Sequence, residues 1–335
     1  MMQPTGSPCP ARWRHSPTRA LWLVVVAAAL MLSLLPPFAE DASAAAMSSN
    51  IAPSSGALFG AYVNSRGGLT QQETTARLER QLGRRLAIAN QYRGWSSRTF
   101  GKEAEHVAAG RVPMISWRAT DTQFDSRRAQ KIARGDYDQL IRTAADNMKA
   151  LRGPVLLRFA WEMDQERGAR QYIGEPGDFI AAWRRVHTIF QQRGATNVEF
   201  VWAPRANSFN KGTGPNWYPG DGYVDWIGGS AVPVNSYREF TTIYDGFYRW
   251  GRTKNKPLLI WGGVRENPAD AAWKARWIGS AHSTIANQWT NVKAFVYYHA
   301  RSPSGNDYFA DTSTRAFDAF KRMGCASHFR PGNGC

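Results

Sequence analysis

The chain has 335 residues and a formal net charge of +16, from 42 Lys and Arg against 26 Asp and Glu. Its basic residues are dispersed, with no run longer than pairs such as Arg84-Arg85, which argues against nucleic-acid binding and favours a solvated basic surface. The histidines lack the short spacing of a metal site, so we expect no metal and no cofactor.

Residues 1–46 are typical of a secretory signal peptide. Arginines precede an apolar run over residues 21–35, and small residues at 42–46 offer a cleavage site. The run is about 15 residues long, which is short for a membrane span. An uncleaved anchor is the alternative, although no later segment is apolar enough to cross a bilayer. We therefore expect a secreted or cell-envelope protein, a monomer with one folded domain over residues 47–335.

Short apolar runs alternate with amphipathic helical patterns along this domain. Thr70 and Gly83 are expected to cap the first helix, and Pro176 to open a helix that ends near Gly194. Residues 203–222 form a long loop rich in Gly, Pro and Asn, which we expect to wall a site. The expected strands cover residues 58–63, 86–89, 112–117, 155–159, 198–202, 226–230, 257–260 and 292–298.

Eight short strands that alternate with helices predict a closed (β/α)₈ TIM barrel, an α/β fold in a single domain. An open doubly wound sheet is the alternative. It is disfavoured because no Gly-x-Gly-x-x-Gly turn follows the first strand.

Glu162 is the candidate catalytic acid. It follows the apolar strand at residues 155–159, and the carboxyl ends of barrel strands are where catalytic groups are held. A general acid needs partial burial, so that it keeps its proton near neutral pH, together with access to the substrate. A solvated loop residue is the alternative reading.

Indole and phenol side chains recur just past the expected strand ends. Aromatic faces suit sugar rings, whose C–H groups form apolar patches, whereas core packing is the alternative for any single ring. With Arg158 of the fourth strand and Trp217 of the long loop, the expected substrate-binding set is Trp95, Trp117, Arg158, Trp161, Trp202, Trp217, Trp261 and Tyr298.

Several segments together resemble glycoside hydrolase family 26, the β-mannanase family, across nearly all of the expected mature chain. The segments are Gly135-x-Tyr137-Asp138, PVLLRFAWEM at 154–163, VWAP at 201–204, WYPGDGYVDWIG at 217–228 and KPLLI at 256–260. The resemblance implies the barrel fold and a retaining mechanism, with an acid/base Glu after strand four and a nucleophilic Glu after strand seven. Glu162 matches the first role.

The chain departs from the family pattern at four positions. Trp161 stands where the family has His, Asp164 where it has Asn, and Val232 near the slot of a Tyr that orients the nucleophile. The slot of the nucleophile itself reads Trp261-Gly262-Gly263, without a carboxylate.

Glu266, a few residues further on, is the candidate second carboxylate, with an exposed or capping charge as the alternative. Asp225 precedes its strand, so it is expected at the end of the barrel opposite the site.

Two functions of different classes remain. The first is a secreted hydrolase of mannan or a related β-glycan that uses Glu162 as acid/base. The second is a polysaccharide-binding barrel that has lost catalysis, because retaining hydrolysis needs two carboxyls about 5 Å apart. The expected partner in both cases is a polysaccharide.

Cys325 and Cys335 remain after removal of a leader that contains Cys9. An even pair near the C-terminus of a secreted chain favours a disulfide, and two free thiols are the alternative.

Overall fold

A computed structural model describes residues 49–120, 125–167, 169, 171–234, 236–329 and 335. The expected signal peptide at 1–46 lies outside these residues. Eight parallel strands pair in chain order, and β8 pairs with β1, so the barrel is closed and the predicted (β/α)₈ fold is confirmed. The strands are β1 (Leu58–Val63), β2 (Ile88–Arg93), β3 (Val112–Trp117), β4 (Val155–Phe159), β5 (Val198–Trp202), β6 (Trp226–Ala231), β7 (Leu258–Gly262) and β8 (Val292–His299).

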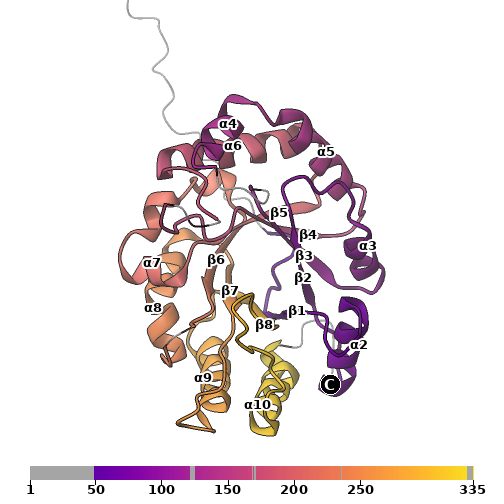
Figure 1. The fold of residues 1–335 in the computed structure, drawn as a ribbon, viewed down its shortest axis with the longest axis vertical. Coiled ribbons are helices and arrows are strands. Elements are labelled where there is room, and N and C mark those ends of the chain that lie inside the picture. The colour runs from indigo at the N-terminus through magenta and orange to yellow at the C-terminus, as the bar shows by residue number, and fades with distance from the viewer. Residues whose placement is uncertain (1–48, 121–124, 168, 170, 235, 330–334) are drawn as a thin grey trace, which may run out of the picture. The chain divides into compact units, whose positions relative to one another are not determined.

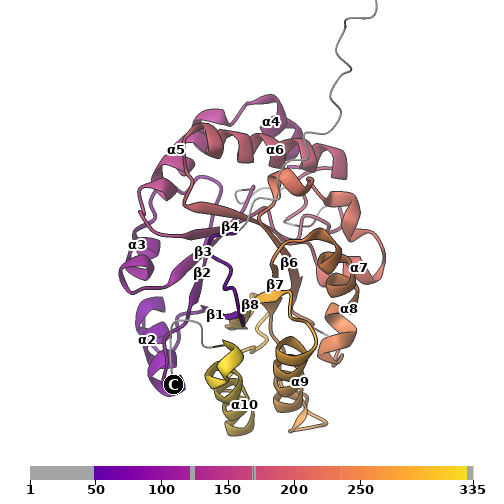
Figure 2. The same cartoon turned by 180° about the vertical axis from the view of Figure 1, so that it is seen from behind.

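Helices surround the strands in chain order (Figures 1 and 2). The α-helices are α2 (Gln71–Leu82), α3 (Gly101–Ala108), α4 (Arg128–Arg134), α5 (Asp138–Lys149), α6 (Pro176–Gln192), α7 (Ala206–Asn210), α8 (Phe240–Gly251), α9 (Trp273–Asn287) and α10 (Thr314–Cys325). Short 3₁₀ turns are η1 (Gly214–Trp217), η2 (Asp221–Tyr223), η3 (Arg252–Lys254) and η4 (Ser327–Phe329).

Local sequence signals explain where α2 begins and ends. Thr70 forms a capping box with Glu73, and Gly83 takes a left-handed conformation with φ of 78°, as its position predicted. The prediction missed α4, and also α7 within the long loop, because one or two turns carry too few apolar residues to show a helical period. It also began β2 two residues early.

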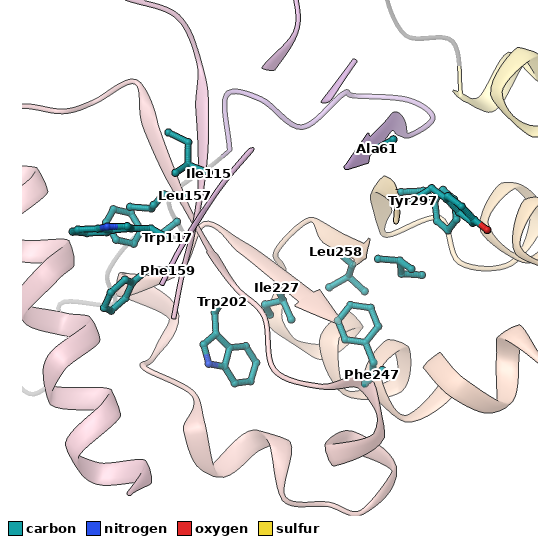
Figure 3. Packing of buried hydrophobic residues seen from close by; sticks show 14 of the residues in the cluster. Ala61, Ile115, Trp117, Leu157, Phe159, Trp202, Ile227, Phe247, Leu258 and Tyr297 are labelled. Carbon is teal, nitrogen blue, oxygen red and sulfur yellow. The ribbon is translucent and has the colours of Figure 1, made fainter. Parts of the chain in front are cut away.

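Side chains on alternate residues of each strand fall into two layers of core. One layer fills the barrel, with Leu156 and Leu259 among its members. The other fills the space between strands and helices, where Trp117, Phe159 and Trp202 pack (Figure 3). Because the strand period is two, a shift of one residue moves a side chain from one layer to the other.

The end of the barrel at the amino termini of the strands is closed by the segment that begins at Ser49. The Glu199 carboxylate accepts hydrogen bonds from the Ser49 hydroxyl at 2.6 Å, the Asn50 backbone N–H at 2.6 Å and the Trp226 indole at 2.7 Å. Asp225 lies at this same end, where it accepts a 2.7 Å bond from the Phe200 N–H. Burial raises the pKa of Asp225 to about 6.

Cys325 and Cys335 form a disulfide with a Cα–Cα distance of 5.4 Å, which confirms the predicted pair. The C-terminus lies beside α2 (Figure 1). In the described part of the chain, no helix combines the length and the apolar character that a bilayer span requires.

Candidate active site

Inward-facing side chains at the carboxyl ends of the strands form a polar and aromatic layer. Two hydrogen bonds join strands that are not neighbours, so these side chains must meet inside the barrel: Arg158 to the Ser230 hydroxyl at 3.4 Å, and the Trp261 indole to Asn90 Oδ1 at 3.0 Å. The members at or near the strand ends are Tyr62, Tyr92, Ser116, Arg158, Ser230, Trp261 and Tyr298.

Glu162 is held just past β4 by an unusual backbone turn. Ala160 and Glu162 both have positive φ, 43° and 55°, which costs energy for residues with a side chain. Two hydrogen bonds fix the turn to the neighbouring strand ends. Ala160 N–H donates to the Trp117 carbonyl, and Glu162 N–H donates to the Ala203 carbonyl, both at 2.9 Å. The turn therefore holds the Glu162 backbone between the ends of β3 and β5.

The Glu162 carboxyl is partly exposed and sits in a desolvated setting. Burial raises its pKa, the positive charge of Arg158 works in the opposite direction, and the nearby Asp164 adds to the rise. Gln165 Nε2 donates to Glu162 Oε2 at 2.9 Å. A carboxyl whose pKa is raised keeps its proton to higher pH, which is the property of a general acid.

Two pockets share Glu162 and Val232. The larger, the aromatic arm, has a volume of about 710 Å³. Its lining residues are Tyr62, Asn64, Tyr92, Arg118, Trp161, Glu162, Gln171, Val232, Val234, Trp261, Tyr298, Arg301, Ser302, Pro303 and Tyr308.

The smaller pocket, the polar arm, has a volume of about 280 Å³. Its lining residues are Glu162, Arg205, Asn207, Ser230, Ala231, Val232, Pro233, Ser236, Arg238 and Ile243. Glu162 is thus the carboxylate that both arms contact, and it lies where a chain of sugars running from one arm to the other would pass.

A buried hydrogen-bond network supports the floor of the aromatic arm. Asn90 accepts from the Trp261 indole and donates to the Ser116 hydroxyl at 2.8 Å. Arg158 Nε donates to the same hydroxyl at 3.0 Å, and its guanidinium carbon lies 4.3 Å from the centre of the Trp261 ring. A connected network of this kind fixes the orientation of the rings above it.

Four of the predicted binding residues belong to this site. Trp161, Trp261 and Tyr298 line the aromatic arm, and Arg158 lies beneath it. Tyr92 contacts Trp161 with ring centres 5.1 Å apart.

The other four predicted binding residues lie elsewhere, which corrects that interpretation. Trp95 and Trp117 stack on each other with ring centres 4.7 Å apart in the layer between strands and helices. Trp202 packs on Tyr218 with ring centres 5.0 Å apart, and Trp217 packs on Phe179 with ring centres 5.7 Å apart. These four indoles line neither arm. Trp117 and Trp202 lie on the outward face of their strands, away from the barrel interior.

Glu266 also lies apart from the two arms. Its carboxylate accepts hydrogen bonds from the Thr312 hydroxyl at 2.6 Å and the Ser313 hydroxyl at 3.0 Å, just before α10 begins. Glu266 lines neither arm. The Glu266 carboxylate thus binds two hydroxyls near the start of α10 and is not placed as a second carboxylate opposite Glu162.

The slot of the family nucleophile is occupied by a ring and a glycine. The Trp261 side chain takes the inward position. A Cβ on Gly262 would overlap the Ala231 carbonyl oxygen and the Tyr244 hydroxyl, on the outer side of the strand. Tyr244 already donates to the Trp261 carbonyl at 3.1 Å. A side chain at position 262 therefore has no space and does not point into the aromatic arm.

The sequence prediction missed Tyr62, Tyr92, Asn90 and the arginines of both arms. Strand phase could have found the first three, since Tyr62 follows Leu58 by four residues and Tyr92 follows Ile88 by four, on the same strand face. The arginines lie on loops, where no period indicates direction. Within the described residues, no group of three His, Cys, Asp or Glu side chains is arranged to hold a metal.

Comparison with known proteins finds a matching family model and several relatives and solved structures that resemble the chain. The sequence model of glycosyl hydrolase family 26 matches residues 95–257. The chain is 27% identical over 287 residues to Endoglucanase H of Acetivibrio thermocellus, covering 80% of this chain and 30% of that one. It is 28% identical over 137 residues to a beta-1,3-xylanase of Alcaligenes sp, covering 39% and 27%. The chain thus spans less than a third of the length of these relatives.

Solved structures of mannanases share the fold. A family 26 β-mannanase from Bacteroides ovatus superposes with a TM-score of 0.60 at 16% identity, over 82% of this chain and 90% of that one. An endo-β-1,4-mannanase from Cellulomonas fimi gives 0.62 at 16% identity, over 82% and 71%. The family model, which matches nearly half of the chain, and the shared barrel together support membership in glycosyl hydrolase family 26.

Proposed function

We propose that this protein hydrolyses a β-linked polysaccharide, with Glu162 as the proton donor to the leaving oxygen. The observation that carries the proposal is the position of Glu162. It is a partly buried carboxyl with a raised pKa, and it lines both the aromatic arm and the polar arm, which together are called the groove. Family membership supports the reaction class, and the names of the relatives and neighbours, endoglucanase, xylanase and mannanase, all denote action on glycans.

The aromatic arm supports sugar as the ligand. Tyr62 and Tyr298 stack with ring centres 5.5 Å apart, and the Trp161 and Trp261 rings line the same pocket. Aromatic faces bury the C–H patches of sugar rings, while Asn64 and Gln171 offer amides to hydroxyls at the edge. Mannan is the first substrate to test, because the similar solved structure from Bacteroides ovatus is described as a family 26 β-mannanase.

The test compares two carboxyl-to-amide variants on the same loop. Glu162→Gln is expected to lower the release of reducing ends from β-mannan or β-glucan by about 10²- to 10⁴-fold, the usual contribution of a general acid. Glu166→Gln is the matched control, because Glu166 is exposed four residues further on and lines neither arm. Equal rates in wild type and Glu162→Gln would contradict the proposal.

A second function, glycan binding without hydrolysis, is favoured by one specific observation. Glu162 is the single carboxylate among the described residues that line the two arms, and the nucleophile slot holds Trp261 and Gly262. Retaining hydrolysis uses a second carboxyl about 5 Å away, and inversion uses one about 6.5 to 9.5 Å away. Glycan binding by the wild type with no reducing ends released over long incubation would establish this function instead.

Secretion is part of the same proposal. An arginine-flanked apolar run with small residues at 42–46 and a disulfide between Cys325 and Cys335 both suit an oxidising compartment. Release of a shortened chain into the medium, with its new N-terminus near residue 47, is the expected outcome. Retention of residues 1–46 in the membrane fraction would favour the anchor.

A further inference from the structure

We propose that the groove takes an anionic glycan, a β-linked polysaccharide whose sugar rings carry carboxylates or similar negative groups. The inference rests on the proposed function in one respect only, namely that the groove binds sugar chains.

The charged side chains of the groove are strongly biased toward one sign. Among the described residues, the aromatic arm is lined by Arg118 and Arg301, and the polar arm by Arg205 and Arg238, against the single carboxylate of Glu162. A neutral mannan or glucan offers only hydroxyls and ether oxygens, so it needs no such bias. Arginine is the side chain that best matches a carboxylate, through two parallel N–H donors.

The arginines differ in how far their charge is already balanced. Arg301 forms a two-point ion pair with Asp307 at 2.7 and 2.9 Å, and Arg205 contacts Asp164. Arg238 instead donates to neutral acceptors, the Asn207 side chain at 3.5 Å and the Thr242 carbonyl at 3.3 Å. Within the described residues, no carboxylate oxygen lies within ion-pair distance of Arg238, so its charge is directed to the polar arm.

A fifth arginine adds charge from below. Arg158 is fully buried, with its guanidinium carbon 4.3 Å from the Trp261 ring centre and 5.3 Å from that of Trp161. Its hydrogen-bond partners are hydroxyls, and none of its nitrogens pairs with a carboxylate of the described chain. A cation that water does not surround is screened weakly, so its field extends through the rings into the aromatic arm.

The direct test uses two polymers that differ only in charge. Polymannuronate has the β-1,4-linked ring of β-mannan with a carboxylate in place of the C6 hydroxymethyl group. Wild-type protein is expected to bind polymannuronate at least fivefold more tightly than β-mannan by calorimetry at low salt. This difference should shrink when the salt concentration is raised to about 0.3 M, because screening lengths fall below about 10 Å.

Variants separate the groove from the general basic surface. Arg238→Gln is expected to weaken polymannuronate binding about fivefold more than it weakens β-mannan binding, while Arg238→Lys keeps most of the affinity for polymannuronate. Arg301→Gln and Arg276→Gln form a matched pair, since each arginine is exposed and pairs with an aspartate six residues away. Arg276 lines neither arm, so only Arg301→Gln should weaken binding.

Each outcome decides between the claims. Equal affinity for the two polymers in low salt overturns this inference and leaves the hydrolase proposal standing. Equal losses in Arg301→Gln and Arg276→Gln, or competition by polyglutamate, would show non-specific attraction to the net positive charge of the protein and overturn the inference as well. Binding to neither polymer would overturn this inference too, whereas the hydrolase proposal is tested separately by the release of reducing ends from β-mannan or β-glucan. A sulfated mannan that binds as tightly as polymannuronate would support the inference with charge, not the carboxylate, as the recognised feature.

Discussion

Two sets of aromatic residues lie at the carboxyl ends of the strands. One set lines the aromatic arm, and the other packs in the core between strands and helices. Tyr62 at the end of β1 stacks on Tyr298 with ring centres 5.5 Å apart, and both rings line the aromatic arm. Trp117 at the end of β3, labelled in Figure 3, stacks on Trp95 with ring centres 4.7 Å apart. Both rings are buried between strands and helices. The residue type and the height in the barrel are similar, but the strand face differs.

The difference shows that strand phase assigns an aromatic residue to function or to stability. An outward ring has protein on every side and contributes burial energy. An inward ring at the carboxyl end of a strand packs on the barrel core on one side and faces the open pocket on the other. Its outer face therefore remains available to a ligand. Four variants test this distinction, from the largest expected effect to the smallest.

Replacing an outward ring should cost the most stability. Trp117→Ala removes the stack on Trp95 and the indole hydrogen bond to the Gly94 carbonyl at 3.1 Å. We expect a loss of about 3 to 5 kcal/mol in the free energy of unfolding, measured by chemical denaturation. Trp117→Phe should lose less, because it keeps a ring. A loss below 1 kcal/mol in Trp117→Ala would contradict the assignment of this ring to the core.

Filling the glycine of the nucleophile slot should cost somewhat less. Gly262→Ala forces a Cβ against the Ala231 carbonyl and the Tyr244 hydroxyl, so we expect a loss of about 2 to 3 kcal/mol in the free energy of unfolding. Gly279→Ala is the matched control, because its Cβ meets open space on α9, where alanine should stabilise the helix by about 0.5 to 1 kcal/mol. A Gly262→Ala variant as stable as wild type would show that β7 accommodates a side chain.

Truncating an inward ring should affect binding more than folding. Tyr62→Ala removes a partly exposed ring of the aromatic arm, so glycan affinity is expected to fall about tenfold, equivalent to about 1.4 kcal/mol. Tyr62→Phe keeps the ring and should keep the affinity, as measured by calorimetry. Unchanged affinity in Tyr62→Ala would remove this ring from the ligand surface.

Replacing Glu162 should have the smallest effect on the free energy of unfolding, and the direction of this effect depends on pH in a predictable way. Because burial raises the pKa of Glu162 above its ordinary value of 4.5, ionising it in the folded state costs stability. Wild type and Glu162→Gln should therefore have a similar free energy of unfolding below pH 4.5, and wild type should lose stability relative to the variant as pH rises through the raised pKa. If the free energy of unfolding of wild type instead rose relative to that of Glu162→Gln toward neutral pH, the conclusion that burial raises the pKa of Glu162 would be contradicted.

The sequence was sufficient for the fold because each strand and most helices carry local signals. Val155 to Phe159 is an apolar run after a Gly-Pro break, and Thr70 and Gly83 mark the ends of α2. The position of Glu162 after β4 followed directly from that strand. The family resemblance suggested the acid/base role of Glu162. It also indicated that the expected nucleophilic carboxylate after β7 is absent.

The site was harder to predict, because its residues meet across the barrel. Trp117 and Trp202 were assigned to the rim on residue type alone, although the period of two from Ile115 and Phe200 already gave them the outward face. Loop contacts such as those between Glu266 and Thr312, or Arg205 and Asp164, depend on chain segments that approach only in the folded barrel. No local pattern encodes them.

The leaving-group dependence of Glu162→Gln tests the central claim most directly. A general acid protonates the leaving oxygen, so its loss matters for a polysaccharide and far less for a dinitrophenyl glycoside, whose leaving group departs without a proton. We predict that Glu162→Gln cleaves polysaccharide about 10²- to 10⁴-fold more slowly than wild type and retains much more of its rate on the dinitrophenyl glycoside. Equal losses on both substrates, or none on either, would contradict the role of Glu162 as the proton donor.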